Sequence, residues 1–507
     1  MKPGQPGRMP WRLTRAPLLG AVCAAALLGM TGCSIGPAYV RPAVTVPAAY
    51  KENGGASGAG VLSTSAANST TGPAAPAQAA PGWTSAAPAD SKPRGAWWTR
   101  FGDSELNTLE ASVSVSNQTV QKAVAQLQEA RAMVQSAHAA YLPTIGAGAS
   151  ATREHDSANV IGHHETAGKS YNDYAVALDA SWEPDLWGRI AHENDAARAG
   201  AQASAADLES VRLGVQAELA VDYFNLRGLD ASKRLLDQTV KDYQQTLDLT
   251  QSRFTVGVSS QADVTQAQTQ LQSTEAQDID LGVARAQYEH AIATLTGVPA
   301  STFSLPPAVT DFTPPAIPVG VPSELLERRP DIAAAERRAA AANDQIGIAQ
   351  SAFYPDLVLS ATGGIGSSTL TNWLTAPSRM WTIGPALIGT LFDGGRREAM
   401  TAKAKAQYDA SAADYRQTVL TAFQEVEDNL ASLRILQQEV SKQNEAVASA
   451  RKTLQLELDQ YRIGTVGYLE VVTAQSTALA NERTAVDLSR RQMDASVLLV
   501  KALGGIW

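Results

Sequence analysis

Side chains that could bind a metal ion or transfer protons are sparse in this chain of 507 residues, which has six histidines. Three of them gather in the stretch EHDSANVIGHHE together with acids: His155, Asp156, His163, His164 and Glu165. Imidazole and carboxylate groups bind zinc, but the same polar composition is common in an exposed loop between two strands, and we favour the loop. Because the sequence has no glycine-rich phosphate-binding motif and no metalloprotease motif, it predicts no metal, no cofactor and no enzyme.

Cys33 is the residue whose neighbours point to a covalent modification. It follows a positively charged start and an apolar run, residues 16–30, that is too short to span a membrane. The end of this run, LLGMTGC, resembles a bacterial lipobox, with Met30 where leucine is usual. We expect residues 1–32 to be a lipoprotein signal peptide, and Cys33 to carry an S-diacylglycerol and an N-acyl chain such as palmitate, which together anchor stably. By the same resemblance, Ser34 favours the outer membrane. The alternative is an ordinary signal peptide with a chance cysteine.

The charge of the chain limits its partners. The formal net charge is −9, and removing residues 1–32, which carry four basic residues and no acid, would make it −13. An acidic chain without a dense basic patch is not expected to bind nucleic acid. The other cysteine, Cys23, lies in the segment to be removed, so no internal disulfide is expected.

One stretch of sequence occurs twice. FTVGVSSQADVTQAQ, residues 254–268, aligns without a gap with YRIGTVGYLEVVTAQ, residues 461–475. The alignment pairs Gly257 with Gly464 and Asp263 with Glu470, each 207 residues apart. Glycine among small or polar neighbours favours a turn between helices. We therefore predict two helical hairpins, with tips near Gly257 and near Gly464 and Gly467.

Two long regions are free to form the helices of these hairpins. No proline occurs between Pro184 and Pro299 or after Pro385, and proline is the residue that breaks helix interiors. Apolar residues in the second region recur every three or four positions from Tyr415 onward, which is close to the coiled-coil period. A further helix over about 104–141 should stack end to end on the shorter arm of the first hairpin.

Segments ahead of each hairpin show the pattern of strands. In YAVALDASWE, apolar residues alternate with small or polar ones, as expected for a strand with two unlike faces. This and weaker segments predict strands at about 144–153, 172–183, 356–367 and 380–392. Strands cross a bilayer only as a closed barrel, and small barrels need about eight strands. Four strands in one chain therefore imply a barrel shared by several chains, and three chains would supply twelve strands.

Together these features resemble the outer-membrane factor family of bacterial efflux ducts, of the TolC/OprM type, and in particular its NodT-like lipoprotein branch. The similarity covers nearly the whole chain after residue 32, in blocks that follow the order of the family: CSIGPAYVRP, WWTRFGDSELNTL, WEPDLWGR, ERRPDIAAAE, LFDGGRR and ALGGIW. Pro184 departs from the family pattern, which usually has a β-branched or aliphatic residue there.

The resemblance implies an α+β membrane protein, a homotrimer with a twelve-stranded outer-membrane β-barrel continued by a periplasmic helical barrel. The implied function is the outer-membrane channel of a tripartite efflux system, of the kind linked to multidrug resistance. It would conduct substrates passively to the exterior from a periplasmic adaptor (a membrane fusion protein) and an inner-membrane pump. The expected organisation after the signal peptide begins with a lipidated segment, 33–100, which contains a low-complexity mobile tether at 53–93 and becomes ordered from about residue 94. The first repeat follows at 101–299, with its hairpin at 188–297. An equatorial connection at 300–330 leads to the second repeat at 331–507, with its hairpin at 395–503.

Site residues also follow from the resemblance. The tips, with Gly257, Asp263, Gly464 and Gly467, would face the adaptor, and Glu470 would help to line a periplasmic aperture. Thr473 stands where a second acid is common, a departure from the pattern. Three copies of Glu470 around an axis would repel one another and favour cations. The alternative is that Glu470 is a solvated acid at a helix start, where the helix dipole favours it.

A rival interpretation is a periplasmic coiled-coil lipoprotein with a structural role and no transport. It accounts for the lipid and the long helices. It does not account for four candidate strands or for a duplication that keeps its register, so we favour the channel.

Overall fold

The computed structural model describes residues 35–52, 94–159, 167–308 and 312–505. They form two compact units, and each unit takes segments from both halves of the chain. The first unit comprises residues up to 41, 130–201 and 338–411; the second comprises 42–129, 202–337 and 412–507. The two repeats therefore divide the chain by sequence similarity, whereas the two compact units divide it by which residues pack together. The two divisions do not coincide.

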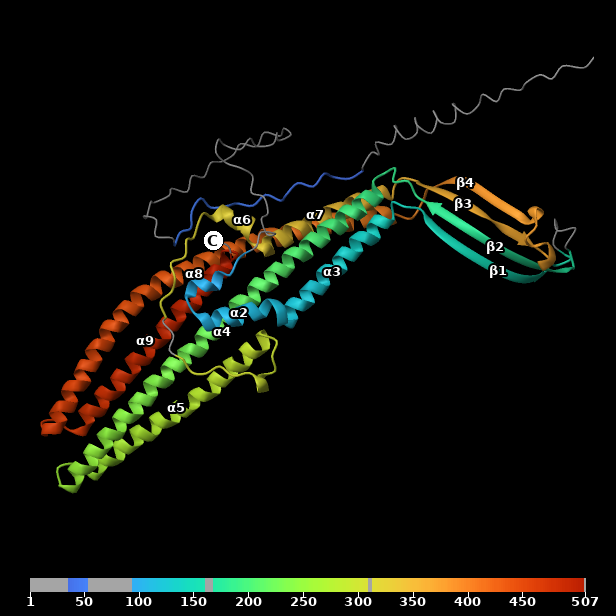
Figure 1. Ribbon diagram of the computed structural model, residues 1–507. Coiled ribbons are helices and arrows are strands. Elements are labelled where there is room, and N and C mark those ends of the chain that lie inside the picture. Colours follow the sequence, from blue (N-terminus) through green and yellow to red (C-terminus); the bar gives the residue numbers. More distant parts are fainter. Residues whose placement is uncertain (1–34, 53–93, 160–166, 309–311, 506–507) are drawn as a thin grey trace, which may run out of the picture. The chain divides into compact units, whose positions relative to one another are not determined.

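The first unit contains one antiparallel sheet in the order β1-β2-β3-β4 (Figure 1). Its strands are β1 (Thr144–His155), β2 (Ser170–Trp182), β3 (Asp356–Ser367) and β4 (Arg379–Ile388), and short 3₁₀ turns, Leu370–Asn372 and Ala376–Ser378, join the last two. All four strands lie where alternation predicted them, with ends shifted by up to four residues. Pairing of β2 with β3 joins the two halves of the chain, since Leu178 lies opposite Gly363.

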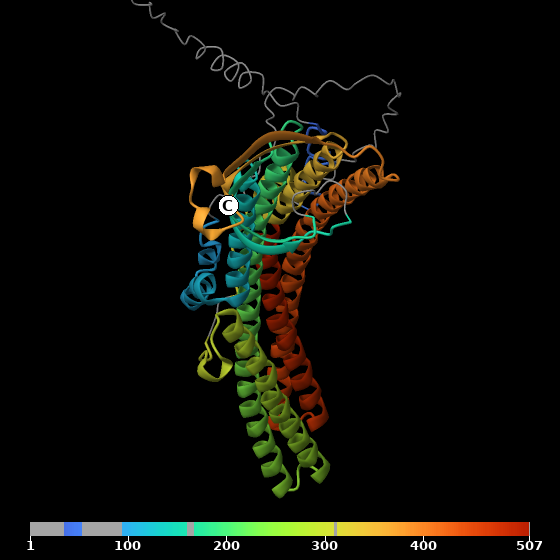
Figure 2. The same ribbon diagram turned by 90° about the vertical axis from the view of Figure 1, so that its right-hand side faces the viewer.

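The two hairpins are α4 (Arg189–Thr255) with α5 (Gln261–Leu295), and α8 (Arg396–Ile463) with α9 (Tyr468–Ala502). Within the second unit they lie side by side in both views (Figures 1 and 2). An aspartate shortly before each long helix bonds its first amides: Asp185 accepts from the amides of residues 190 and 191, and Asp393 from those of 395 and 397. No helix of the described residues is both long and apolar enough to cross a bilayer.

The helix expected over 104–141 is in fact two helices, α2 (Ser104–Ser116) and α3 (Gln118–Ala139). Asn117 breaks it with an extended ψ of 122°. Its side chain accepts from the Val120 amide at 3.0 Å and donates to the Leu295 carbonyl, at the end of α5, at 2.8 Å. The predicted single helix was wrong because a buried asparagine can satisfy the backbone groups that a break exposes, and no proline or glycine marks the place. The break does meet the end of α5, as the predicted stacking requires.

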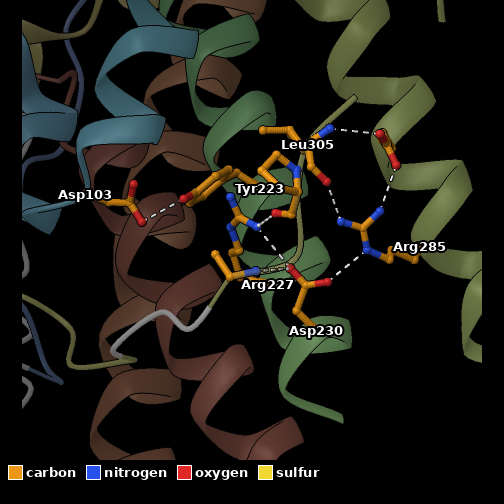
Figure 3. A network of polar contacts seen from close by, with 9 residues as sticks. Asp103, Tyr223, Arg227, Asp230, Arg285 and Leu305 are labelled. Carbon is orange, nitrogen blue, oxygen red and sulfur yellow. Dashed lines mark hydrogen bonds and ion pairs between the residues drawn. The ribbon is translucent and has the colours of Figure 1, made fainter. Parts of the chain in front are cut away.

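A polar network holds the connection between the halves against the first hairpin (Figure 3). Arg227, 2% exposed, donates to the Pro306 carbonyl at 2.8 Å and to Asp230 at 3.0 Å. Arg285 donates to Asp230 at 2.8 Å and to the Leu305 carbonyl at 2.6 Å. Charge-assisted bonds of this kind are the stronger ones in proteins. They fix the backbone of an otherwise irregular segment, which continues through the 3₁₀ turns Ala300–Thr302 and Pro322–Glu324 to α6 (Leu325–Arg328) and α7 (Pro330–Ser351).

Tyr223 extends this network toward the N-terminal end of α2. Its hydroxyl donates to Asp103 at 2.7 Å (Figure 3), and burial raises the pKa of that phenol. Asp103 in turn caps α2, accepting from the amides of Glu105 and Leu106. The 3₁₀ turn Trp97–Phe101 precedes this cap. Helix α2 is therefore tied to α4 by a bond whose buried donor would be costly to leave unpaired.

Residues 42–52 dock on the second unit as an extended segment. Tyr50 is buried in a cluster with Tyr415 and Val419 of α8. The carboxylate of Glu427 accepts from the amides of Lys51 and Glu52 at 2.8 and 3.0 Å. The expectation that order begins near residue 94 was therefore wrong, because a few buried side chains and one carboxylate hold this short segment. Residues 53–93, the predicted tether, lie outside the described residues.

Candidate functional site

The two hairpin tips have matching backbones. Helix α4 ends at Thr255 and α8 at Ile463, and the glycine that follows each helix has positive φ, 79° at Gly257 and 83° at Gly464. Most side chains rarely adopt this conformation, whereas glycine adopts it at little cost. The repeated sequence therefore encodes the same helix ending twice.

The helices that return from the tips begin differently. At α5, Ser260 and Asp263 form a capping box, in which each side chain bonds the backbone amide of the other. At α9 the cap is Gly467, without a side-chain bond, and Glu470 occupies the position equivalent to Asp263. Within the described part of the chain, the exposed carboxylate of Glu470 makes no hydrogen bond or ion pair. Asp263 is thus used to start a helix, whereas Glu470 is available for another contact.

Both tips expose apolar side chains that the sequence analysis did not single out. Val256 and Val258 of the first tip are 73% and 61% exposed, and Ile463 and Leu469 of the second are 76% and 63% exposed. Exposed apolar side chains grouped in this way commonly mark a protein contact. A signal was present in the sequence, because FTVGV places valines directly beside the predicted turn.

Arg253 and Tyr461 join the two tips to each other. The Arg253 guanidinium lies 4.5 Å from the centre of the Tyr461 ring and also donates to the Tyr461 backbone carbonyl. The Tyr461 hydroxyl donates to Thr250 at 3.1 Å, and Gln475 donates to Thr246 at 3.0 Å. Around these bonds lies a small core that includes Leu247, Val264, Tyr468 and Val471. Each hairpin tip is therefore held by the other, through pairs more than 200 residues apart in sequence.

Glu470 and Thr473 line one side of a groove between α8 and α9. The groove also contains Glu457 and Thr453 of α8. The Thr473 hydroxyl bonds its own helix, since it donates to the Leu469 carbonyl at 2.7 Å. Glu457 adds a second carboxylate that the sequence analysis missed. The predicted aperture residues thus share one surface, which is acidic.

Other predicted sites are not brought together in the same way. Cys33, His163, His164 and Glu165 lie outside the described residues. His155 lies on β1, where its ring nitrogen is 3.0 Å from the Ser170 hydroxyl. Among the residues that the structure does describe, no three histidine, cysteine or acidic side chains are placed to hold a metal ion.

The sheet has one apolar face and one polar face, which follows from its register. Ile145, Ala180, Ala361 and Ile383 lie opposite one another across the four strands. Alternate positions share a face, so the same face also carries Leu359 of β3 and the exposed apolar side chains Leu178, Trp381 and Leu387. On the other face Asp179 accepts from Thr362 at 2.7 Å. A face of this kind is suited to lipid on one side and water on the other.

The chain matches known proteins over most of its length. A family model described as "Outer membrane efflux protein" matches residues 111–298 and 321–505. The "Cation efflux system protein CusC" of Escherichia coli is 29% identical over 95% of this chain and 97% of its own. The "Pyoverdine export outer membrane protein OpmQ" of Pseudomonas putida is 31% identical over 84% of this chain and 92% of its own.

A solved structure supports the same similarity. The outer-membrane channel OprN superposes with a TM-score of 0.81 at 27% identity, covering 94% of this chain and all of the OprN chain. The resemblance found in the sequence blocks is therefore confirmed by the whole chain and by its fold.

Proposed function

The chain belongs to the outer membrane efflux protein family, and from this premise we propose how it serves as the outer-membrane channel of a tripartite efflux system. The observation that carries the proposal is the four-stranded sheet with one apolar face and two edge strands, β1 and β4. An open edge in a bilayer would leave backbone groups without partners. The rival interpretation, a structural coiled-coil lipoprotein, does not explain this sheet.

Closure of the sheet requires other copies of the chain. Within the described residues, β1 and β4 each pair on one side only. We propose that β4 of one protomer pairs with β1 of the next, and that three protomers give a barrel of twelve strands, a size within the range of outer-membrane barrels. The polar face with Asp179 would then line the lumen, and the face with Trp381 would contact lipid. Cys33, if acylated as proposed, would add a second attachment to the outer membrane.

The tips are the proposed contact with a periplasmic adaptor. They combine exposed apolar side chains, such as Val256 and Ile463, with a backbone fixed by glycine and by the capping box of α5. The two tips of each chain would give six in the trimer. Binding there would compete with the packing of one tip on the other, and would shift the population of closed and open states.

Glu470 is proposed to line the aperture at the second tip. Its support is the exposed carboxylate on the first turn of α9, beside Glu457 of α8. Three-fold repetition would concentrate negative charge at a narrow mouth, which favours cations. We assign no catalytic role to the chain and place the choice of cargo in the inner-membrane pump, since relatives of similar identity are named for cation efflux and for pyoverdine export.

Planar-bilayer recording of the purified protein, with and without an adaptor, tests this proposal. We expect a low conductance for the protein alone and a higher one with adaptor, together with a heat-labile trimer on gels. Val256→Asp with Val258→Asp should abolish the response to adaptor and leave the trimer intact. A matched control is Leu374→Asp, since Leu374 is 82% exposed in the loop between β3 and β4. A stable monomer, or a protein that never conducts, would contradict the proposal.

A further inference from the structure

The ring of His192 lies between two hydrogen-bond acceptors. Its Nδ1 is 2.8 Å from Oδ1 of Asp344, and its Nε2 is 3.1 Å from the carbonyl oxygen of Ile35. His192 is in the first turn of α4 and Asp344 is on α7, whereas Ile35 belongs to an extended segment that follows Cys33 by two residues. The side chains of His192 and Asp344 are 12% and 18% exposed. Water is therefore a poor substitute for either bond.

The segment of residues 35–41 is seated closely at this point. The Ile35 amide donates to the Trp187 carbonyl at 3.2 Å, and Asn343 donates to the Pro37 carbonyl at 2.8 Å. Gly36 has a φ of 152°, and a Cβ there would lie 2.9 Å from both the Gly347 Cα and the His192 ring. A Cβ on Gly347 would collide with the same ring. Two glycines thus make room for the imidazole, which argues that its position is specific.

The number of protons on the pair decides whether both bonds form. A neutral imidazole has one N–H, but here two oxygens that accept hydrogen bonds face its two nitrogens. Both contacts are satisfied only if the histidine is doubly protonated beside a carboxylate, or if Asp344 is protonated and donates to Nδ1. We propose that His192 and Asp344 form a proton-dependent latch that holds the segment after Cys33 against α4 and α7. Loss of the shared proton leaves a lone pair facing an oxygen, so the latch opens as the pH rises.

The surrounding charges agree with this direction. Burial raises the pKa of Asp344, the bond from His192 opposes that shift, and Asp195 reinforces it. Asp195 is itself paired with Arg198 at 3.3 Å. Residues 35–41 offer the latch a backbone carbonyl, and two further bonds of this segment, to the Trp187 carbonyl and from the Asn343 amide, involve groups that do not titrate. The docked state therefore holds the shared proton more tightly than the released state, so docking is favoured at low pH and is lost as the pH rises.

A spin label on the segment measures the latch directly. Cys23 lies in the signal peptide and Cys33 is proposed to be acylated, so Val40→Cys supplies one free thiol per chain, which mass spectrometry verifies. In the lipidated trimer we expect two mobility components in the label's spectrum. Their mobile-to-immobile ratio should rise about fivefold between pH 5.5 and 8.5, the factor that corresponds to one net hydrogen bond. The same label at Ala48→Cys is the control, because the amides of residues 51 and 52 bind Glu427 and involve no histidine.

Two variants separate the latch from simple packing. Asp344→Asn can donate to Nδ1 while a neutral His192 donates to Ile35, so the segment should stay immobile across the whole pH range. His192→Gln removes the imidazole and should give a ratio that is independent of pH. A wild-type ratio that stays constant over this range would overturn the latch, and so would an Asp344→Asn variant that keeps the wild-type response.

Discussion

Two carboxylates at equivalent positions of the repeat have different surroundings. Asp263 bonds the backbone of residue 260 in a capping box, whereas Glu470 follows a glycine cap and stays exposed. The difference comes from one neighbour, since Ser260 offers a hydroxyl and Gly467 does not. At the scale of single residues, the duplication therefore has kept the turn and freed one acid for a different role.

Glu470→Ala should lower the preference of the open channel for cations, because it removes three like charges from the proposed aperture. The measurement is the reversal potential under a KCl gradient in planar bilayers. Asp263→Asn is the matched control: it should leave the reversal potential unchanged and weaken its hairpin by about 1 kcal/mol through loss of a cap. Equal reversal potentials for Glu470→Ala and the parent trimer would place Glu470 away from the constriction.

Glu110 predicts a pH dependence of stability. It is fully buried on α2, neither of its carboxyl oxygens has a hydrogen-bond partner among the described residues, and burial raises its pKa to about 9. The folded state therefore binds a proton that the unfolded chain releases above its ordinary pKa of about 4.3. Stability should fall as the pH rises from that value toward 9.

Glu110→Gln should remove this slope, because the amide carries no charge at any pH. We expect the apparent melting temperature of the trimer to be higher than wild type at pH 8, by an amount that corresponds to about 1–3 kcal/mol. The two proteins should converge near pH 4.5. Parallel melting curves across the range would show that Glu110 keeps an ordinary pKa.

At the scale of elements, the hairpin tips are held by each other as well as by their own turns. Each turn has backbone bonds of its own, and α5 has its capping box. The bonds that join one tip to the other run between α4 and α8 through Arg253 and Tyr461. An element that is fixed by a few bonds to one neighbour can be released by a partner that competes for them. We therefore expect the tips to move when a partner competes for these bonds.

Arg253→Met should raise the conductance of the trimer without adaptor. The variant keeps an unbranched, mostly aliphatic stem but loses the guanidinium, and with it the bond to the Tyr461 carbonyl and the contact with its ring. A charge-assisted hydrogen bond contributes about 1.5–3 kcal/mol, which would shift the closed-to-open ratio about tenfold or more. Single-channel recording measures this, with Arg462→Met as control because the Arg462 side chain forms its ion pair with Asp459 of its own helix. An unchanged open probability would mean that other contacts hold the tips.

At the scale of the whole molecule, the chain is incomplete alone. Its sheet ends in two edge strands, and its apolar face needs lipid. Residues 35–41 lie against α4 and α7 within the first unit, and residues 42–52 lie against α8 within the second unit. The proposed lipid is therefore joined to the fold by a docked segment before the predicted tether begins.

Cys33→Ala should abolish lipid labelling and cleavage at that site. The reason is chemical, since the thioether can form only on the cysteine sulfur. Incorporation of labelled palmitate measures it, and the trimer on gels is the control, because residue 33 lies outside the four strands of the sheet. Undiminished labelling of the variant would show that the lipid is attached at another residue.

Local patterns in the sequence determined the elements. Glycine repeated at 257 and 464, together with long stretches free of proline, predicted both hairpins and their tips, because φ > 0 and helix periodicity are properties of neighbouring residues. Alternation predicted all four strands for the same reason. Six sequence blocks in order were enough to indicate the family.

Only the tertiary structure decided what depends on distant partners. The break at Asn117 needs the end of α5, and the bond between the tips joins Arg253 to Tyr461. The docking of residues 35–52 needs His192, Asp344 and Glu427. Such contacts depend on how distant elements approach one another in space. They cannot be predicted from the residues that are adjacent in the sequence. Sequence patterns therefore located the helices, strands and turns, whereas the latch, the tip contacts and the register of β2 on β3 emerged only from the folded chain.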